Sequence, residues 1–233
     1  MSSSTPESPG RSRPVVSNQS GPHPGLAARI ARCRAHVHRR PLPAHARAPL
    51  AILDAAIAAH AGPVVLDSGC GTGESSLALA AQHPAALVIG IDKSAARLAR
   101  AARLPPHPRV RFVRTRLEDA WRHARAEAWP VAAHYLLYPN PWPKQHQLAR
   151  RWHAQAAFAD LIALGGRLEM RTNWAVYAAE FALALGYWGG PEATVETLPP
   201  GAPLSAFERK YRASGHALYR VAAVIPRSFA EFG

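Results

Sequence analysis

The stretch VVLDSGCGTGES, residues 64–75, carries the most informative pattern in the chain. An apolar run ends at Asp67, and Gly69, Gly71 and Gly73 follow at alternate positions before a helical pattern begins. Glycine lets the backbone turn sharply and approach a ligand closely. In open α/β sheets such ligands bind beyond the carboxyl ends of the strands. The stretch therefore predicts the first strand, the ligand-binding loop and the first helix of an α/β domain.

Strand and helix patterns alternate after this loop. The predicted strands are residues 63–67, 86–92, 109–113, 131–138, 166–172, 193–198 and 216–225. The predicted helices are residues 74–82, 94–102, 118–126, 148–164 and 174–185. Such alternation implies a parallel sheet covered on both faces, and we expect the last two strands to close it as an antiparallel pair. The expected fold class is a doubly wound, Rossmann-like, mostly parallel α/β fold with seven strands.

The first 60 residues do not share this alternation. Residues 1–25 are rich in Ser, Pro and Gly, and we expect them to form a disordered basic tail. Residues 26–60 are expected to form an N-terminal helical extension, with one helix from Leu26 and a second over about 48–60. The catalytic domain is then expected over residues 61–233.

The chain is strongly basic, with 28 Lys and Arg against 15 Asp and Glu and a formal net charge of +13. This balance favours a polyanionic partner such as RNA, because Lys and Arg replace counterions along a phosphate backbone. The alternative is a coding bias toward Arg, Ala and Pro, which are all abundant.

Other classes of protein fit the composition poorly. Cys33 and Cys70 are the only cysteines, which argues against a disulfide framework. No uninterrupted apolar run approaches the roughly 18 residues of a membrane span, and the N-terminus has no apolar signal-peptide core. The histidines are scattered without metal-ligand spacing. We therefore expect a cytoplasmic monomer without membrane association and without a metal.

The identity of residue 74 narrows the ligand. A dinucleotide site would have a glycine there, but the chain has Glu74, at the helix N-terminus where a pyrophosphate would bind. S-adenosylmethionine has cationic amino and sulfonium groups and no phosphate, so this acid does not oppose it. Asp92 closes the next strand, where an acid can accept hydrogen bonds from ribose hydroxyls. This combination resembles the class I S-adenosylmethionine-dependent methyltransferases; the alternative is a glycine turn with an incidental acid.

The adenine of such a cofactor would lie near the end of the third strand. Glu118 and Asp119 follow that strand, and either could accept from the adenine amino group. Alternatively, both are simply acids at a helix N-terminus, where the helix dipole favours them.

A second informative stretch is YPNPWPK, residues 138–144, in which prolines flank Asn140. Proline fixes the backbone and removes an amide donor, so this segment is a rigid turn at a strand end. Arg150 with Arg151, RTNW and SAFERK follow it in order. Together these motifs are similar to the bacterial tRNA (guanine-N7)-methyltransferase family, which has Phe-Pro-Asp-Pro-Trp-x-Lys, paired arginines, Thr-Asp-Trp and Thr-Lys-Phe-Glu. The resemblance covers about residues 26–225.

The resemblance implies a role for each matching residue. Asp67 and Asp92 would be the cofactor acids beside the glycines, and Asn140 would take the place of the active-site aspartate, facing the cofactor. The implied substrate-binding residues are Lys144, Arg150, Arg151, Asn173, Ser205, Phe207 and Glu208. The chain departs from the family at Asn140 and Asn173, which are amides where the family has acids, and at Ala206, where a lysine is usual.

The basic residues after the turn have two interpretations. Arg150 and Arg151, with Lys144, could contact tRNA phosphates. Alternatively, the two arginines form the solvated face of the helix predicted over 148–164.

The chemistry limits what the change at Asn140 can do. Guanine N7 carries a lone pair and no proton, so its methylation needs in-line alignment rather than a general base. Alignment of two bound reactants can supply about 7–11 kcal/mol. The guanine becomes cationic in the transition state, and an amide oxygen stabilises that charge less than a carboxylate would.

The expected function is therefore tRNA (guanine46-N7)-methylation with S-adenosylmethionine as methyl donor. One alternative is an amino-group methyltransferase of the N6-adenine type that uses Asn140, Pro141 and Trp142. The other is a catalytically silent RNA-binding relative, suggested by the two acid-to-amide changes.

Overall fold

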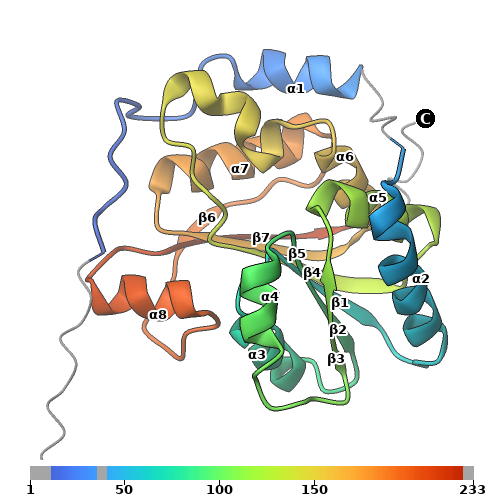
Figure 1. Cartoon of the computed structure of the whole chain (residues 1–233). Coiled ribbons are helices and arrows are strands. Elements are labelled where there is room, and N and C mark those ends of the chain that lie inside the picture. Colours follow the sequence, from blue (N-terminus) through green and yellow to red (C-terminus); the bar gives the residue numbers. More distant parts are fainter. Residues whose placement is uncertain (1–11, 36–40, 228–233) are drawn as a thin grey trace, which may run out of the picture.

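The computed structural model describes residues 12–35 and 41–227. Within them lies one seven-stranded sheet with the order β3-β2-β1-β4-β5-β7-β6 (Figure 1). Its strands are β1 (Val64–Ser68), β2 (Leu87–Asp92), β3 (Val110–Arg114), β4 (Val131–Leu137), β5 (Gly166–Thr172), β6 (Val195–Thr197) and β7 (Tyr219–Ile225). Strands β1 to β5 pair in parallel, whereas β7 is antiparallel to β5 and β6. The predicted doubly wound fold and its closing antiparallel pair are confirmed.

The helices are α1 (Leu26–Arg34), α2 (Ala44–Ala58), α3 (Glu74–Gln82), α4 (Ala95–Ala101), α5 (Leu117–Ala126), α6 (Phe158–Ala163), α7 (Ala175–Tyr187) and α8 (Ala206–Ala213). Successive side chains of a strand point to opposite faces of the sheet. In β1, Leu66 therefore joins one apolar cluster, which also holds buried residues of α1, α2, α5, α6 and α7. Its neighbour Val65 joins the other cluster, with buried residues of α3. Both faces of the sheet are thus covered.

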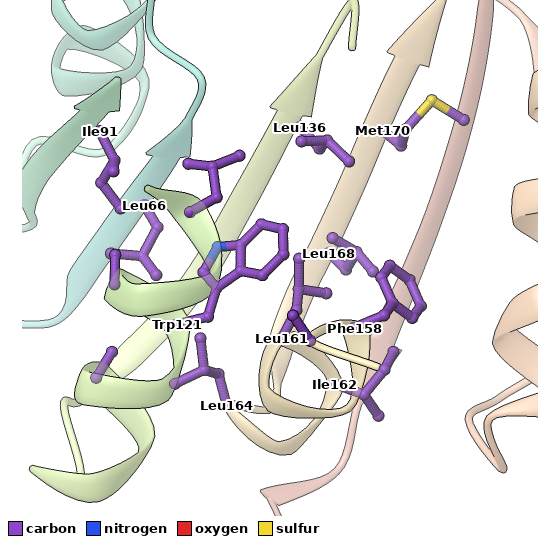
Figure 2. Packing of buried hydrophobic residues seen from close by; sticks show 14 of the residues in the cluster. Leu66, Ile91, Trp121, Leu136, Phe158, Leu161, Ile162, Leu164, Leu168 and Met170 are labelled. Atoms are coloured by element: carbon purple, nitrogen blue, oxygen red, sulfur yellow. The ribbon is translucent and has the colours of Figure 1, made fainter. Parts of the chain in front are cut away.

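Trp121 of α5 is the largest fully buried side chain of the core. Figure 2 shows its indole against the sheet between Leu66 and Leu136, with α6 side chains such as Phe158 beyond it. The indole N–H donates to the Ser68 hydroxyl at 2.9 Å. This bond satisfies the polar atom of a buried Trp, and it anchors α5 against the end of β1.

The helix predicted over residues 148–164 is wrong. Two short 3₁₀ helices (Gln145–Arg150 and Trp152–Ala154) and α6 occupy this region instead. Arg151 separates the two 3₁₀ helices with an extended backbone, φ −73° and ψ 135°. The apolar spacing was real, because Leu148 and Ile162 are buried, but Arg151 turns inward and interrupts the helix.

The structure places residues 12–25 of the expected N-terminal tail against the folded domain; residues 1–11 lie outside the described part. The segment 12–25 makes long-range contacts, and Gln19 is only 8 % exposed. Composition alone did not reveal this, because the contacts of the segment are with residues distant in the chain: Gln19 and His23 bond to Glu180, and Val15 packs against the main apolar cluster. The second helix also begins earlier than expected, at Ala44 with Pro49 inside it.

The described ranges contain neither a membrane-spanning helix nor a cluster of metal ligands. No helix among residues 12–35 and 41–227 is long and apolar enough to cross a membrane. The same residues contain no group of three or more His, Cys, Asp or Glu that could hold a metal ion. Cys33 and Cys70 are buried free thiols.

Buried His134 predicts a loss of stability in acid. It lies on β4, it is 1 % exposed, and burial lowers its pKa from 6.5 to about 4. A lowered folded-state pKa gives stability that is present above pH 6.5 and lost as the pH falls toward 4. Between pH 7 and pH 4.5, we expect the free energy of unfolding to fall by about 2 kcal/mol more in the wild type than in His134→Leu. Urea unfolding at both pH values measures this difference; parallel losses in the two proteins would contradict it.

Candidate active site

The glycine loop joins β1 to α3 and leaves open space on one side. Its three glycines all have positive φ, 88° at Gly69, 57° at Gly71 and 86° at Gly73. A Cβ added at Gly69 or Gly71 would meet no atom within 4 Å, whereas one at Gly73 would lie 2.7 Å from Phe112 and 2.8 Å from Ala101. Gly73 is therefore required by packing. The other two glycines leave a cradle in which a ligand can approach the backbone.

Asp67 lies beneath this loop and is 1 % exposed. Its Oδ2 accepts hydrogen bonds from the hydroxyls of Ser75 at 2.6 Å and Ser76 at 2.7 Å, while Oδ1 has no partner among the described residues. Burial raises the pKa of Asp67 to about 6, although the two serine hydrogen bonds oppose the shift. Such a buried acid with one unpaired oxygen is suited to receive a cationic ligand group.

Asp92 stabilises the glycine loop from the end of β2. Its Oδ2 accepts from the Gly71 amide at 3.1 Å, and its Oδ1 accepts from the Ser94 amide at 2.8 Å. Arg97 approaches the same carboxylate at 3.6 Å. The predicted contact of Asp92 with ribose hydroxyls remains a prediction.

Glu118 and Asp119 lie in the first turn of α5, as the helix-dipole interpretation required. Both are buried, and both have cationic partners: Arg116 pairs with Glu118, and Arg122 lies 3.3 Å from Asp119. Asp119 Oδ2 nevertheless has no hydrogen-bond partner among the described residues. Of the two acids, Asp119 is therefore the better candidate for an adenine contact.

Asn140 lies on an exposed loop that follows β4. Two non-glycine residues of this loop have positive φ, Tyr138 at 51° and Trp142 at 46°. Such backbone strain costs on the order of 1–3 kcal/mol per residue and requires support from surrounding structure. The Asn140 Oδ1 accepts from the Trp142 amide at 3.3 Å, which is one such support.

Of the three basic residues predicted to contact tRNA after this loop, two are exposed and one is buried. Lys144 and Arg150 are exposed, and the Arg150 guanidinium lies 4.8 Å from the centre of the Trp142 ring. Arg151 is 0 % exposed and offers no surface to a tRNA phosphate in this structure; its contact with tRNA stays a prediction. It pairs with Glu180 instead, because a buried guanidinium needs a compensating charge.

Asn173 lies at a shallow pocket of about 330 Å³. Its side-chain amide is 3.0 Å from Nδ1 of His216. The pocket is lined by Ser12, Pro14, Asn173, Ser214, Gly215, His216 and Ala217. The described N-terminal segment thus contributes one wall of the space around this predicted substrate residue.

The predicted C-terminal substrate loop is helix α8. The Ser205 hydroxyl caps it by accepting from the Glu208 amide at 3.1 Å. Glu208 is 0 % exposed and pairs with Arg171 and Arg212, each at 3.0 Å; its contact with substrate stays a prediction. Phe207 is 41 % exposed and is available to a partner.

Sequence reasoning missed three contributors to the site. Arg209 of α8 pairs with Glu74 at the start of α3, which connects α8 to the glycine loop. Glu180 and Gln19 form the buried polar cluster around Arg151. A signal for Glu180 was present, because it is the one charged residue of the apolar helix α7. Nothing in the sequence indicated Gln19.

Comparison with known proteins gives a consistent result. A family model described as "Putative methyltransferase" matches residues 61–221. The curated tRNA (guanine-N(7)-)-methyltransferase of Hydrogenovibrio crunogenus is 30 % identical over 168 residues, covering 67 % of this chain and 70 % of that protein. The one from Treponema pallidum (strain Nichols) is 29 % identical over 164 residues, covering 68 % of this chain and 66 % of that protein. The chain therefore spans about two thirds of the length of that relative.

Two solved structures share the fold. The 16S rRNA methyltransferase KamB has a TM-score of 0.55 at 19 % identity, over 73 % of this chain and 91 % of that chain. A 16S rRNA (adenine(1408)-N(1))-methyltransferase mutant with the cosubstrate SAM, from Catenulisporales acidiphilia, has a TM-score of 0.54 at 18 % identity, over 75 % and 90 %.

The raised pKa of buried Asp67 predicts that the free energy of unfolding falls as the pH rises, and that Asp67→Asn removes this part of the pH dependence. Its folded-state pKa, about 6, lies above its ordinary value of 3.8, so the folded protein holds this proton more tightly than the unfolded chain does. The stability that this proton contributes is lost as the pH rises through 6. From pH 5 to pH 8, we expect the free energy of unfolding to fall by about 1.5 kcal/mol more in the wild type than in Asp67→Asn. Chemical denaturation without ligand tests this. A variant whose stability changes with pH as the wild type does would refute the assigned pKa.

Proposed function

The chain belongs to the tRNA (guanine-N7)-methyltransferase family, and from this membership we propose that it methylates N7 of guanine 46 in tRNA. S-adenosylmethionine, when bound, supplies an electrophilic methyl group on a cationic sulfur.

The observation that carries the proposal is the pairing of β1 with β4. These strands are parallel neighbours, with Asp67 opposite Tyr135. Their carboxyl ends therefore lie at the same edge of the sheet. The glycine loop after β1 and the Asn140 loop after β4 are consequently adjacent, which is the arrangement that a methyl donor and an acceptor base require.

The residues present fit the proposed donor. The open cradle at Gly69 and Gly71 accommodates a ligand against the backbone, and the unpaired Asp67 Oδ1 can accept from a cationic amino group. Asp92 at the end of β2 and Asp119 at the start of α5 are the candidates for the ribose and the adenine amino group. The acid Glu74 at the start of α3 still disfavours a phosphate ligand, although Arg209 offsets part of its charge.

Methylation of guanine N7 requires the protein mainly to align the methyl donor with the acceptor nitrogen. Guanine N7 has no proton to remove, so an amide at position 140 does not deprive the site of a base. Asn140 would stabilise the developing positive charge on the base with its amide dipole. Lys144, Arg150 and Phe207 are the exposed side chains proposed to contact tRNA, and Asn173 lines the adjoining pocket.

The amino-group alternative requires the Asn140 side-chain oxygen to accept from an exocyclic amino group. This oxygen accepts from the Trp142 amide at 3.3 Å, and an amide oxygen has two lone pairs, so the loop geometry does not separate the two activities; the identity of the methylated nucleoside does.

Incubation with unmodified tRNA and labelled S-adenosylmethionine, followed by nucleoside analysis, tests the proposed function. We expect N7-methylguanosine, and we expect none when guanosine 46 of the tRNA is replaced by adenosine. N6-methyladenosine in place of N7-methylguanosine would establish the amino-group activity instead. If no label is incorporated, calorimetric titration with the cofactor separates two failures: absence of binding indicates a silent relative, and binding indicates a different substrate.

Restoring the carboxylate at position 140 tests the electrostatic role of this side chain. We expect Asn140→Asp to raise kcat about tenfold, because a carboxylate stabilises the cationic transition state more strongly than an amide dipole. The matched variant Asn140→Leu removes the dipole and should lower kcat. Abolished turnover in a folded Asn140→Asp protein that still binds the cofactor would contradict this account.

A further inference from the structure

A buried polar cluster lies behind the Asn140 loop and joins three distant parts of the chain. Arg151 and Glu180 are both 0 % exposed, and Arg151 Nη1 lies 2.5 Å from each carboxylate oxygen of Glu180. His153, also 0 % exposed, lies 3.1 Å from Glu180. Gln19 completes the cluster: its amide donates to Glu180 at 2.7 Å, and its oxygen accepts from Arg151 at 3.0 Å.

The ion pair at its centre is charged. Burial alone would raise the pKa of Glu180, but hydrogen bonds and charge from His153 and Arg151 outweigh it and lower that pKa to about 2. Burial lowers the pKa of His153, although the hydrogen bond and the charge of Glu180 oppose this shift. Removing two charges from water costs several kcal/mol per ion, so a buried ion pair is weak evidence for a role in stability. Its contacts with the loop therefore suggest another role.

Arg151 is bonded directly to the strained part of the loop. Its Nε and Nη2 donate to the Trp142 carbonyl at 3.2 and 3.0 Å. Trp142 is one of the two loop residues with positive φ, and its amide is the donor to Asn140. Both peptide groups of this residue are thus fixed, one by Arg151 and the other by Asn140. The guanidinium also lies 5.0 Å from the centre of the buried Trp174 ring, which limits its movement.

The N-terminal segment reinforces the same arrangement. The Ser17 hydroxyl donates to the Pro143 carbonyl at 2.6 Å, one residue beyond Trp142. The His23 amide donates to Glu180 at 2.8 Å. Residues 17–23 therefore hold both the loop and the acid that orients Arg151.

We propose that Arg151, oriented by Glu180 and Gln19, is a positioning residue that holds the Asn140 loop in the conformation needed for methyl transfer. This inference rests on the proposed function for its kinetic consequence but not for its structural one. Arg151 acts through the Trp142 backbone and touches neither proposed substrate. The tail that was expected to be disordered thereby becomes part of the support of the active site.

Arg151→Lys tests the proposal in the full chain. A lysine can retain the charge pair with Glu180, but it lacks the planar fork that also reaches the Trp142 carbonyl. We expect kcat to fall about 10–100-fold, while KM for tRNA and Kd for S-adenosylmethionine stay within about twofold of the wild type. Hydrogen exchange should increase in peptides that cover residues 138–147 and remain unchanged in β1 and β4.

Two further variants separate positioning from general stability. Arg125→Lys alters another partly buried ion pair, with Asp160 at 3.1 Å, which lies between α5 and α6 rather than at the loop. It should leave both kcat and loop exchange unchanged. Gln19→Ala removes the hydrogen bonds of Gln19 to Glu180 and Arg151. We expect it to lower kcat and to increase loop exchange, both by less than Arg151→Lys. It provides the same measurements if Arg151→Lys does not fold.

The possible outcomes are distinct. A folded Arg151→Lys protein with wild-type loop exchange overturns the proposal, as does one whose exchange rises uniformly across the core. If the wild type transfers no methyl group to tRNA, the proposed function fails, but the exchange measurements still decide whether Arg151 holds the loop. An increase in KM with an unchanged kcat would indicate substrate binding and would also overturn positioning.

Discussion

The parallel pairing of β1 with β4 fixes where the two loops of the candidate site lie. It places the glycine loop and the proline-flanked Asn140 loop at one edge of the sheet, although about 70 residues separate them in the chain. Parallel strands can be joined only by crossover connections, so the helices that cover both faces follow from the same pairing. The proposed methyl donor and acceptor base could not meet between these loops if the two strands were not neighbours.

Each of the two loops depends on backbone conformations that have to be maintained. The first achieves them with glycine, which adopts positive φ without a steric penalty. The second has Tyr138 and Trp142 at positive φ, and for such residues the strain has to be offset by surrounding contacts. Two hydrogen bonds supply part of that support: Arg151 donates to the Trp142 carbonyl, and the Asn140 Oδ1 accepts from the Trp142 amide. One loop is thus determined locally, and the other depends on residues remote in sequence.

The same contrast explains which predictions succeeded. The strands and the glycine-loop helix were predicted to within a few residues, because short apolar runs and glycine spacing are local signals. The helix expected over 148–164 failed because periodicity does not indicate where a charged residue turns inward. Arg151 and Glu208 were assigned to substrate on motif position, yet both are buried in ion pairs.

Local patterns and motifs kept in order were enough to predict the α/β fold, the conformation-permissive glycine loop and the family. Three features appear only in the folded chain. Arg150 faces solvent whereas Arg151 is buried, α8 contacts the start of α3, and Ser17 contacts the Asn140 loop at Pro143. The physical reason is that burial and ion pairing depend on neighbours that are distant along the chain. Gln19 and Glu180 are 161 residues apart, and only folding brings them into contact.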